Sequence, residues 1–314
     1  MFGVDGKQLQ VQYFCHLSDF KTWNQRDHAK EWLLFPENIG SQLSMDETSL
    51  SNGELYTIVT NKSAKGKKGS VVAIVNGTVS KKVIEVLRKI PEDIRKTVEE
   101  ITIDLAPTMK LIAKRSFPNT VIVSDRFHVQ KLASDAVQEL RIKHRWNAID
   151  QENAERQLAK ETDSTFIPHI LPNGDTTKQL LARSRYLLFK CQEKWTPKQR
   201  FRAEILFERY PELQRAYLLS QKLSQIFGRK VTKNIAYKKL ALWYNDVEQS
   251  CFKSFSIIAN TIKTNYSTIL NYFNNRSTNA SAESFNAKIK ALRRQFRGVR
   301  NTEAFLFRLS KIYA

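Results

Sequence analysis

The sequence has little cysteine and no long apolar run. Its three cysteines, Cys15, Cys191 and Cys251, lie far apart, and no CxxC pair or Cys/His cluster occurs. This spacing supports neither a zinc site nor a disulfide framework, and it fits a reducing cytosol. No apolar run approaches the ~18 residues of a membrane span. The N-terminus also lacks the basic and apolar regions of a secretory signal. We therefore expect a cytoplasmic protein with no membrane partner.

Acidic residues are also scarce compared with basic ones. The chain has 51 Lys and Arg against 31 Asp and Glu, which gives a net charge of +20. Residues 1–150 carry 22 basic and 18 acidic residues, whereas residues 151–314 carry 29 and 13. Such a field favours nucleic acid as a partner, and the C-terminal half is the better candidate for contacting phosphates. A basic face that is only solvated would have the same composition.

Residues 41–125 alternate short strand-like runs with amphipathic helices. The strand candidates, rich in Val, Ile and Thr, are 41–50, 53–61, 69–77, 98–104 and 120–124. Ser80 is placed to cap a helix over 81–90, and Pro107 suits the first turn of another. Before the first strand candidate, the pattern of residues 23–34 predicts a helix that ends at Pro36. The order βββαβαβ is typical of the ribonuclease-H-like fold, a mixed sheet with helices on both faces.

After Asp125 the strand signal largely stops. Residues 128–270 show helical spacing, interrupted most clearly by the loop 166–175. Two final helices are expected at 281–296 and 302–313, with Gly298 as a C-cap between them. We predict an α/β protein of four segments: a helical lead-in (1–40), the first part of a ribonuclease-H-like core (41–134), a large all-helical insertion (135–265) and the C-terminal helices of the core (266–314).

Three carboxylates suit a metal-dependent nuclease. Asp46 lies in LSMDETS, Asp104 in VEEITIDLAPTM, and Glu283 in NASAESFNAKIK on a basic helix. Neighbouring strands lie about 4.8 Å apart, so carboxylates at adjacent strand ends can share two divalent cations about 4 Å apart. Mg²⁺ prefers such oxygen ligands, and a carboxylate from a packed helix would complete the site.

Each of these residues, taken alone, also fits a structural role. Asp104 can cap the helix that follows it, Asp46 can begin a turn, and Glu283 can favour a helix N-terminus. Glu47 and Asp125 are rival metal ligands, because Asp125 follows a strand as directly as Asp104 does. Sequence reasoning leaves open whether Asp125 binds metal or supports the ligands.

Basic and polar residues suggest where DNA would bind. Arg126 and His128 follow Asp125 directly, and Arg183, Arg185, Lys190 and Trp195 combine cations with an aromatic ring. Asn286, Lys290 and Arg294 share nearly one helix face with Glu283, and Lys288, Arg293 and Arg297 widen the basic surface. Next to a metal site, such residues would hold phosphates.

Four stretches of the chain resemble the DDE transposases of bacterial insertion sequences, most closely the ISL-three-type family. The stretches are MDETSL, the region from ITIDLAPTM to SDRFHVQKLASDAVQELR, LLARSRYLLFK, and STNASAESFNAKIKALRRQFRGVRNTEAFLFRL. The resemblance implies a catalytic triad of Asp46, Asp104 and Glu283. It also implies strand cleavage at transposon ends and transfer into target DNA with two Mg²⁺ ions, for which Mn²⁺ can substitute.

The resemblance has consequences for partners as well. It implies double-stranded DNA as substrate, a homodimer or larger assembly on DNA, and a bacterial protein near the nucleoid. Longer members begin with a cysteine-rich zinc module and a helix-turn-helix region, which residues 1–40 do not match. We therefore expect either a separate end-recognition protein or a truncated copy. Two further hypotheses stay open: a non-catalytic DNA-binding protein derived from a transposase, and another ribonuclease-H-like nuclease.

Overall fold

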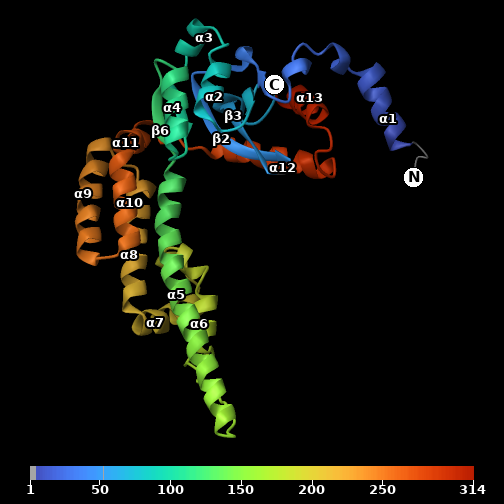
Figure 1. Cartoon of the computed structure of the whole chain (residues 1–314). Helices are drawn as coiled ribbons and strands as arrows, with labels where there is room; N and C mark the ends of the chain where they lie inside the picture. The colour runs from blue at the N-terminus through green and yellow to red at the C-terminus, as the bar shows by residue number, and fades with distance from the viewer. Residues whose placement is uncertain (1–4, 52) are drawn as a thin grey trace. The chain divides into compact units, whose positions relative to one another are not determined.

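The computed structural model describes residues 5–51 and 53–314 of the chain. They form two compact units. The first unit contains the described residues up to Asp125 together with Ser267–Ala314, and the second contains Arg126–Tyr266. The chain therefore leaves the first unit for one long excursion and returns to complete it, as the colours of Figure 1 show.

The first unit contains a six-stranded mixed sheet in the spatial order β1-β4-β3-β2-β5-β6. Its strands are β1 (Trp32–Leu34), β2 (Gln42–Ser51), β3 (Glu54–Asn61), β4 (Val71–Asn76), β5 (Glu100–Ile103) and β6 (Val121–Ser124). β2, β3 and β4 form an antiparallel meander, and β1 pairs antiparallel with β4. On the other side of β2 the pairing becomes parallel, to β5 and then to β6.

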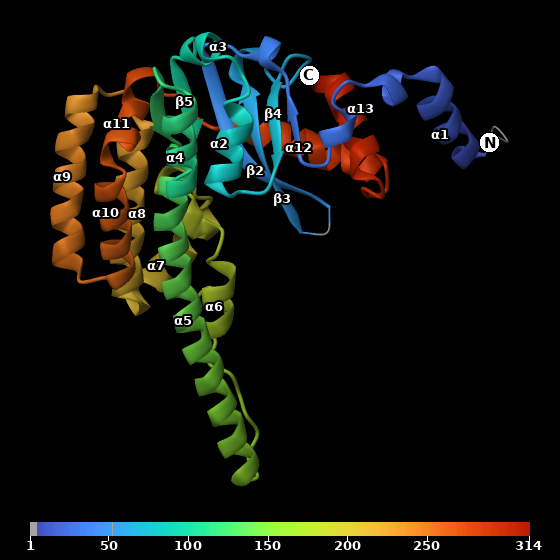
Figure 2. The ribbon, with the colours of Figure 1, turned by 45° about the horizontal axis from the view of Figure 1, so that its top comes forward.

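Helices cover both faces of this sheet. They are α2 (Ser80–Leu87), α3 (Glu92–Lys96), α4 (Pro107–Ser116), α11 (Tyr266–Asn275), α12 (Ala280–Gln295) and α13 (Thr302–Tyr313). Successive strand side chains point to opposite faces. Accordingly, Ile58 packs in a core with α12 and α13, and the next residue, Val59, packs in a second core with α2 and α4. Figure 2 shows α2 and α4 in front of the strands and α12 behind them.

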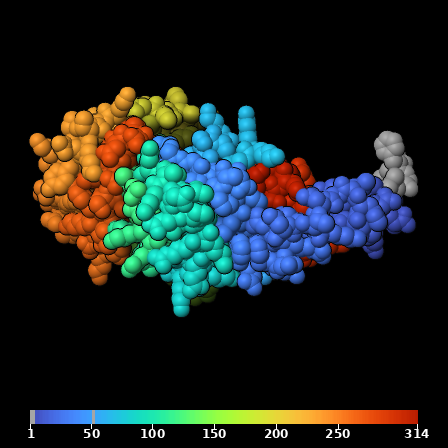
Figure 3. Space-filling view, turned by 90° about the horizontal axis from the view of Figure 1, so that it is seen from above, coloured from blue at the N-terminus to red at the C-terminus, as the bar shows by residue number. Residues whose placement is uncertain are grey.

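The N-terminal segment packs against the end of the chain. It contains α1 (Gly6–Gln12) and a series of short turns before β1. The ring of Phe20 lies 5.1 Å from that of Phe307 on α13, between ring centroids. In the space-filling view the blue N-terminal surface adjoins the red C-terminal surface (Figure 3).

The helix predicted over 23–34 is wrong. Residues 26–28 form a single 3-10 turn, and β1 follows it. The side-chain amide of Gln25 both donates to the Leu34 carbonyl and accepts from its N–H, each at 2.8 Å. Leu33 is fully buried in the sheet core. Tertiary pairing with β4 thus overrides the local helical pattern.

One helix boundary also differs from the sequence-based expectation, and a second one agrees with it. Ser80 does not cap α2, because Val79 occupies the N-cap and Ser80 is already in the first turn. Gly298 does contribute to the end of α12: its N–H donates to the Arg293 carbonyl at 3.0 Å, and its φ is +106°. Arg297 precedes it in the left-handed conformation, with a φ of +53°. This pair of residues forms a Schellman-type C-terminus.

The second unit contains helices joined by loops, and no strand occurs among its described residues. Its helices are α5 (Arg126–Glu161), α6 (Thr177–Arg183), α7 (Pro197–Arg209), α8 (Pro211–Gly228), α9 (Lys233–Ser250) and α10 (Lys253–Thr264). α5 and α9 both pack on α8, and the buried Trp243 of α9 donates from its indole to the Leu219 carbonyl of α8 at 3.0 Å. No helix in the described residues combines the length and apolarity needed to cross a membrane.

One expected helix of this unit is interrupted. The segment 177–191 has helical spacing, but α6 ends at Arg183 and a 3-10 turn, η6 (Leu187–Phe189), follows. Leu187 and Leu188 are both buried in this turn. The Leu187 carbonyl in this turn accepts a hydrogen bond from the Trp195 indole at 2.8 Å, so a tertiary contact holds the interrupted backbone.

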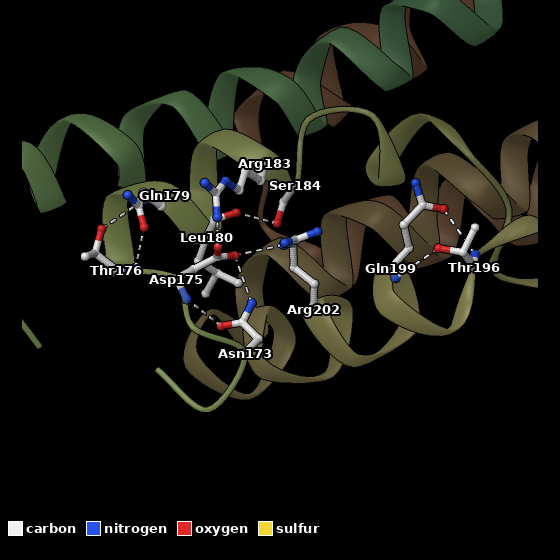
Figure 4. A network of polar contacts seen from close by, with 10 residues as sticks. All are labelled: Asn173, Asp175, Thr176, Gln179, Leu180, Arg183, Ser184, Thr196, Gln199 and Arg202. Carbon is white, nitrogen blue, oxygen red and sulfur yellow. Dashed lines mark hydrogen bonds and ion pairs between the residues drawn. The ribbon is translucent and has the colours of Figure 1, made fainter. Parts of the chain in front are cut away.

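A buried carboxylate ties this region together (Figure 4). Asp175 is 1% exposed and accepts hydrogen bonds from Arg183, from Arg202 at 2.9 Å and from the amide of Asn173 at 2.9 Å. Burial alone would raise the pKa of Asp175, but the two arginines together lower it. The network therefore links the loop before α6 to α7.

We expect Asp175→Asn to lower the free energy of unfolding by about 2 kcal/mol, because it removes a charge-assisted hydrogen-bond pair. A lowered folded-state pKa stabilises the protein above the unfolded pKa of about 3.9, and this stabilisation is lost as the pH falls through the folded value. The stability difference between wild type and variant should therefore shrink below about pH 4. Denaturant unfolding at several pH values measures it.

Asp150→Asn is the matched control, because Asp150 is exposed on α5 in the same unit. Equal losses of unfolding free energy for the two variants would show that the buried network adds no more stability than an exposed aspartate does.

Candidate functional site

Three aspartates line up at one edge of the parallel part of the sheet. Ser44 of β2 pairs with Thr102 of β5, and Thr102 pairs with Val123 of β6. Two residues further along each strand direction stand Asp46, Asp104 and Asp125. Since side chains two residues apart point to the same face, the three carboxylates lie on one face, with Asp46 inside β2 and the other two just after β5 and β6. The N–H of Asp125 still donates to the Ile103 carbonyl at 2.9 Å, which continues the parallel ladder.

Helix α12 is fixed to two of these carboxylates by asparagines. The Asn286 amide donates to the Asp46 carboxylate at 2.6 Å. One turn before Glu283, the amide of the buried Asn279 lies 3.4 Å from the Asp104 carboxylate. Residues spaced by three and four share a helix face, so Glu283 lies between the two asparagines on that face. It is exposed on the helix.

The fourth carboxylate, Asp125, lies near Glu283. Their carboxylate oxygens are within 4.8 Å of each other. Asp125 is 1% exposed, whereas Asp46 and Asp104 are partly exposed. The structure therefore brings Asp125, one of the two rivals that the sequence suggested, close to Glu283.

The other rival, Glu47, is placed differently. It follows Asp46 on β2, so its side chain points to the other face of the strand. Burial first, and then the nearby charge of Asp104, raise the pKa of Glu47. Its N–H donates to the Asp46 carboxylate at 2.8 Å, which helps to orient that group.

The structural alternatives for the three acids can be compared with these contacts. Ala106, not Asp104, is the N-cap of α4, and Asp46 lies within β2 rather than in a turn. Glu283 does lie in the first turn of α12, where a helix dipole favours an acid. An acid in that position can still face the strand-end carboxylates.

A buried ion pair lies beside this edge. Glu100 of β5 is 3% exposed, and Lys62, just after β3, donates to it at 3.2 Å. Lys62 also donates to the Thr102 hydroxyl, and the Asn275 amide donates to Glu100 at 3.1 Å. Burial lowers the pKa of Lys62, and the charges of Glu100 and Asp125 oppose this effect.

Burial acts on Glu100 in the opposite sense. It would raise the pKa of this carboxyl, but hydrogen bonds from Ser277 and Asn275 and the Lys62 charge together lower it. Glu100, Thr102 and Asp104 alternate along one polar strand face. The ion pair thus brings a positive charge to the face on which Asp104 lies.

The donor set fits a hard divalent cation. Carboxylate oxygens are the ligands that such a cation prefers, and those of Asp125 and Glu283 lie within 4.8 Å of each other. Asp46 and Asp104 lie on the same face of the sheet as Asp125. Such an arrangement can hold metal ions that act on a phosphoryl group.

The basic residues predicted on α12 divide into two kinds. Lys288 donates to the Gly66 carbonyl at 2.6 Å, so its ammonium has a structural partner. Lys290, Arg294 and Arg297 are exposed, and Arg293 is partly exposed. The exposed group follows Glu283 along the helix and is available for phosphates.

The other predicted DNA contacts belong to the helical unit. Arg126 and His128 lie in the first turn of α5, where Arg126 donates to the Phe227 carbonyl at 3.2 Å and the His128 ring contacts Phe127 edge to face. Arg183 pairs with Asp175, and Arg185 lies over the ring of Tyr186.

Sequence reasoning missed three residues of the site: Lys62, Glu100 and Asn279. The polar alternation of Glu100, Thr102 and Asp104 between Ile101 and Ile103 was a usable signal for Glu100. Lys62 had no such signal, since it lies in a basic turn and reaches β5 only through the folded sheet. Asn279 resembles an ordinary N-cap, yet its side chain makes no capping bond to α12.

We expect Lys62→Met to lower the free energy of unfolding by about 3 kcal/mol, because it leaves Glu100 as a buried charge without its cation. Adding Glu100→Gln should recover much of the loss, since glutamine keeps an acceptor for Asn275 without a charge. Denaturant unfolding of the two single variants and the double variant measures the coupling.

Lys96→Met is the control, because Lys96 forms an exposed pair with Glu92 on α3. It should leave stability unchanged. A double variant that is no more stable than Lys62→Met would show that the buried charge is not the cause.

Comparison with known proteins agrees with this arrangement. One protein-family profile, described as a transposase and of the DDE, ISL-three type, matches residues 43–309. The match includes both sheet aspartates, the helical unit and α12. No curated protein and no solved structure matches the chain.

Proposed function

Because the chain belongs to the DDE transposases of the ISL-three type, we propose that it cuts DNA at the ends of an insertion sequence and joins them to target DNA, using carboxylate-bound divalent metal ions. Transposition as the general function follows from the family. The chemistry and the residues that perform it are the proposal.

One observation carries the proposal: α12 is bonded to the carboxylates of Asp46 and Asp104 on either side of Glu283. Asn279 contacts Asp104, and Asn286 contacts Asp46. Residues separated by 58 and 179 positions in sequence therefore face one another. A structural acid on a helix would have no reason to lie between two such contacts.

We assign the catalytic, metal-holding role to Asp46, Asp104 and Glu283. Asp125 would support them from its buried position beside Glu283. When bound, two Mg²⁺ ions, or Mn²⁺ in their place, would polarise the scissile phosphate and stabilise the negative charge on the attacking and leaving oxygens. The asparagines hold the carboxylates in fixed orientations, because each donates one amide hydrogen to a carboxylate oxygen.

The exposed cations of α12 would position the DNA backbone. Lys290 and Arg294 lie on nearly the same helix face as Glu283, about two and three turns further on. Arginine can bind a phosphate with two parallel hydrogen bonds. A DNA backbone held there would run along α12 toward the carboxylates.

The sheet topology supports a ribonuclease-H-like classification. An antiparallel meander joined to two parallel strands, β4-β3-β2-β5-β6, has the strand and helix order that the sequence led us to expect. In this proposal the helical unit is an insertion between β6 and the returning C-terminal helices. It provides further basic surface for DNA.

Asp46→Asn, Asp104→Asn and Glu283→Gln should each reduce Mg²⁺-dependent cleavage of element-end DNA by at least about 100-fold. DNA binding without metal should stay within about twofold, since each variant removes a negative charge and no cation. Cleavage gels and fluorescence anisotropy on the same preparations measure the two quantities.

Asp125→Asn separates a supporting role from direct metal binding. We expect a loss of about 10- to 100-fold that raised metal concentration partly restores. Full activity in any triad variant would remove that residue from the site. Complete loss in Asp125→Asn alone would assign its place in the triad to Asp125.

A second test concerns the backbone contacts of α12. Reversing the charges of Arg293, Arg294 and Arg297 to glutamate should flatten the dependence of log affinity on log salt by up to about 3, because each phosphate contact contributes about 0.9 to the slope. The matched control reverses Lys110, Lys114 and Arg115 of α4, which packs on the other face of the sheet. Equal slopes in both triple variants would contradict DNA binding by α12.

A further inference from the structure

The interrupted helix of the second unit presents two aromatic rings to solvent. Tyr186 and Phe189 are 67% and 46% exposed, although Leu187 and Leu188 between them are buried. Residues 187–189 form the 3-10 turn η6, and Tyr186 is its N-cap. In a 3-10 turn, side chains three residues apart are eclipsed, so the two rings lie on the same side of the turn.

The backbone that carries these rings is held from three directions. The Gln138 amide of α5 donates to the Arg185 carbonyl at 3.1 Å, and the Trp195 indole donates to the Leu187 carbonyl at 2.8 Å. The Tyr217 hydroxyl of α8 donates to the Lys190 carbonyl at 2.7 Å. A segment with its carbonyls fixed in this way presents its side chains in a preorganised arrangement, which lowers the entropy lost on binding.

Two cations flank the two rings along the chain. Residues 183–202 contain seven Lys and Arg and one acid, Glu193. The guanidinium of Arg185 lies 5.5 Å from the Tyr186 ring centroid, and Lys190, next to Phe189, is exposed. Burial first, and then the nearby charges of Arg145 and Arg185, lower the pKa of Arg141 beneath this segment. Arg183 and Arg202 are paired with Asp175, so the positive charge beside the rings comes from Arg185 and Lys190.

We name Arg185, Tyr186, Phe189 and Lys190 the aromatic platform, and we propose that it binds an unpaired DNA strand by stacking bases on Tyr186 and Phe189. The flanking cations would contact the phosphates of the same strand. Every base has a π face, so such stacking tolerates any sequence. In duplex DNA the faces of the bases are already covered by neighbouring pairs, and the exposed rings would gain little from it.

The platform rests on the proposed function only in taking DNA as the ligand. It adds the form of the DNA, which is a strand whose bases are unpaired, such as one frayed at a cut end. Binding of DNA measured without metal does not depend on the carboxylate site of the first unit, so the two proposals can fail separately.

The test measures binding of the full chain in EDTA by fluorescence anisotropy, with labelled oligothymidylate and a duplex of equal length as probes. Tyr186→Leu with Phe189→Leu should weaken binding of the single strand by about tenfold or more, and binding of the duplex by less than about twofold. Tyr186→Phe with Phe189→Tyr keeps both rings and should retain single-strand affinity. Both sites are exposed, so unfolding temperatures should match wild type.

Tyr237→Leu is the matched control, since Tyr237 is an equally exposed ring on α9 of the same unit. It should leave both affinities unchanged. Unchanged single-strand affinity in the double leucine variant would overturn the proposal, and so would an equal loss for single strand and duplex. The assay contains EDTA and measures no cleavage, so its result separates failure of the platform from failure of the catalytic proposal.

Discussion

The parallel pairing of β2 with β5, and of β5 with β6, is the constraint on which the candidate site depends. Parallel neighbours end at the same edge of a sheet, so the residues that follow them are brought together whatever their separation in sequence. A shift of β5 by one residue would turn Asp104 to the other face and Ile103 toward the site. The register Ser44–Thr102–Val123 therefore fixes where three aspartates lie.

The same register explains why polar groups are tolerated inside this part of the sheet. Glu100 and Thr102 lie on the face of Asp104, and a strand that buried them without partners would be unstable. Lys62 from the end of β3 and Asn275 from α11 supply those partners. α11 is further tied to β6, because the Asn271 amide donates to the Ile122 carbonyl at 2.9 Å. The helices that return from the long excursion are thus anchored by polar contacts to the strands next to the site.

Much of the sheet could be predicted from the sequence, because its strands are short β-branched runs separated by turns. The strand predicted at 120–124 corresponds to β6, and that at 98–104 corresponds to β5. β1 could not be found in this way, since Trp32–Leu34 is too short for a periodic signal and depends on pairing with β4. The interruption after Arg183 also depends on tertiary contacts, in which two adjacent leucines are buried together.

The candidate site was visible in sequence as residue types, but its internal contacts were not. Asp46, Asp104, Asp125 and Glu283 stood out because acids near strand ends and on a basic helix are uncommon in a chain of this charge. Their mutual orientation depends on Asn279 and Asn286, whose roles appear only when α12 is packed on the sheet. The role of Lys62 was hidden in the same way, because its partner Glu100 lies on β5, 38 positions later in the chain.

The central claim is that a helical acid and two strand acids form one metal site. Titration of the protein with Mn²⁺, followed by electron paramagnetic resonance, tests it without DNA or turnover. The account predicts that Glu283→Gln weakens Mn²⁺ binding as strongly as Asp104→Asn does, although the two residues are 179 positions apart in the chain. A Glu283→Gln protein that binds Mn²⁺ with wild-type affinity and stoichiometry would contradict it.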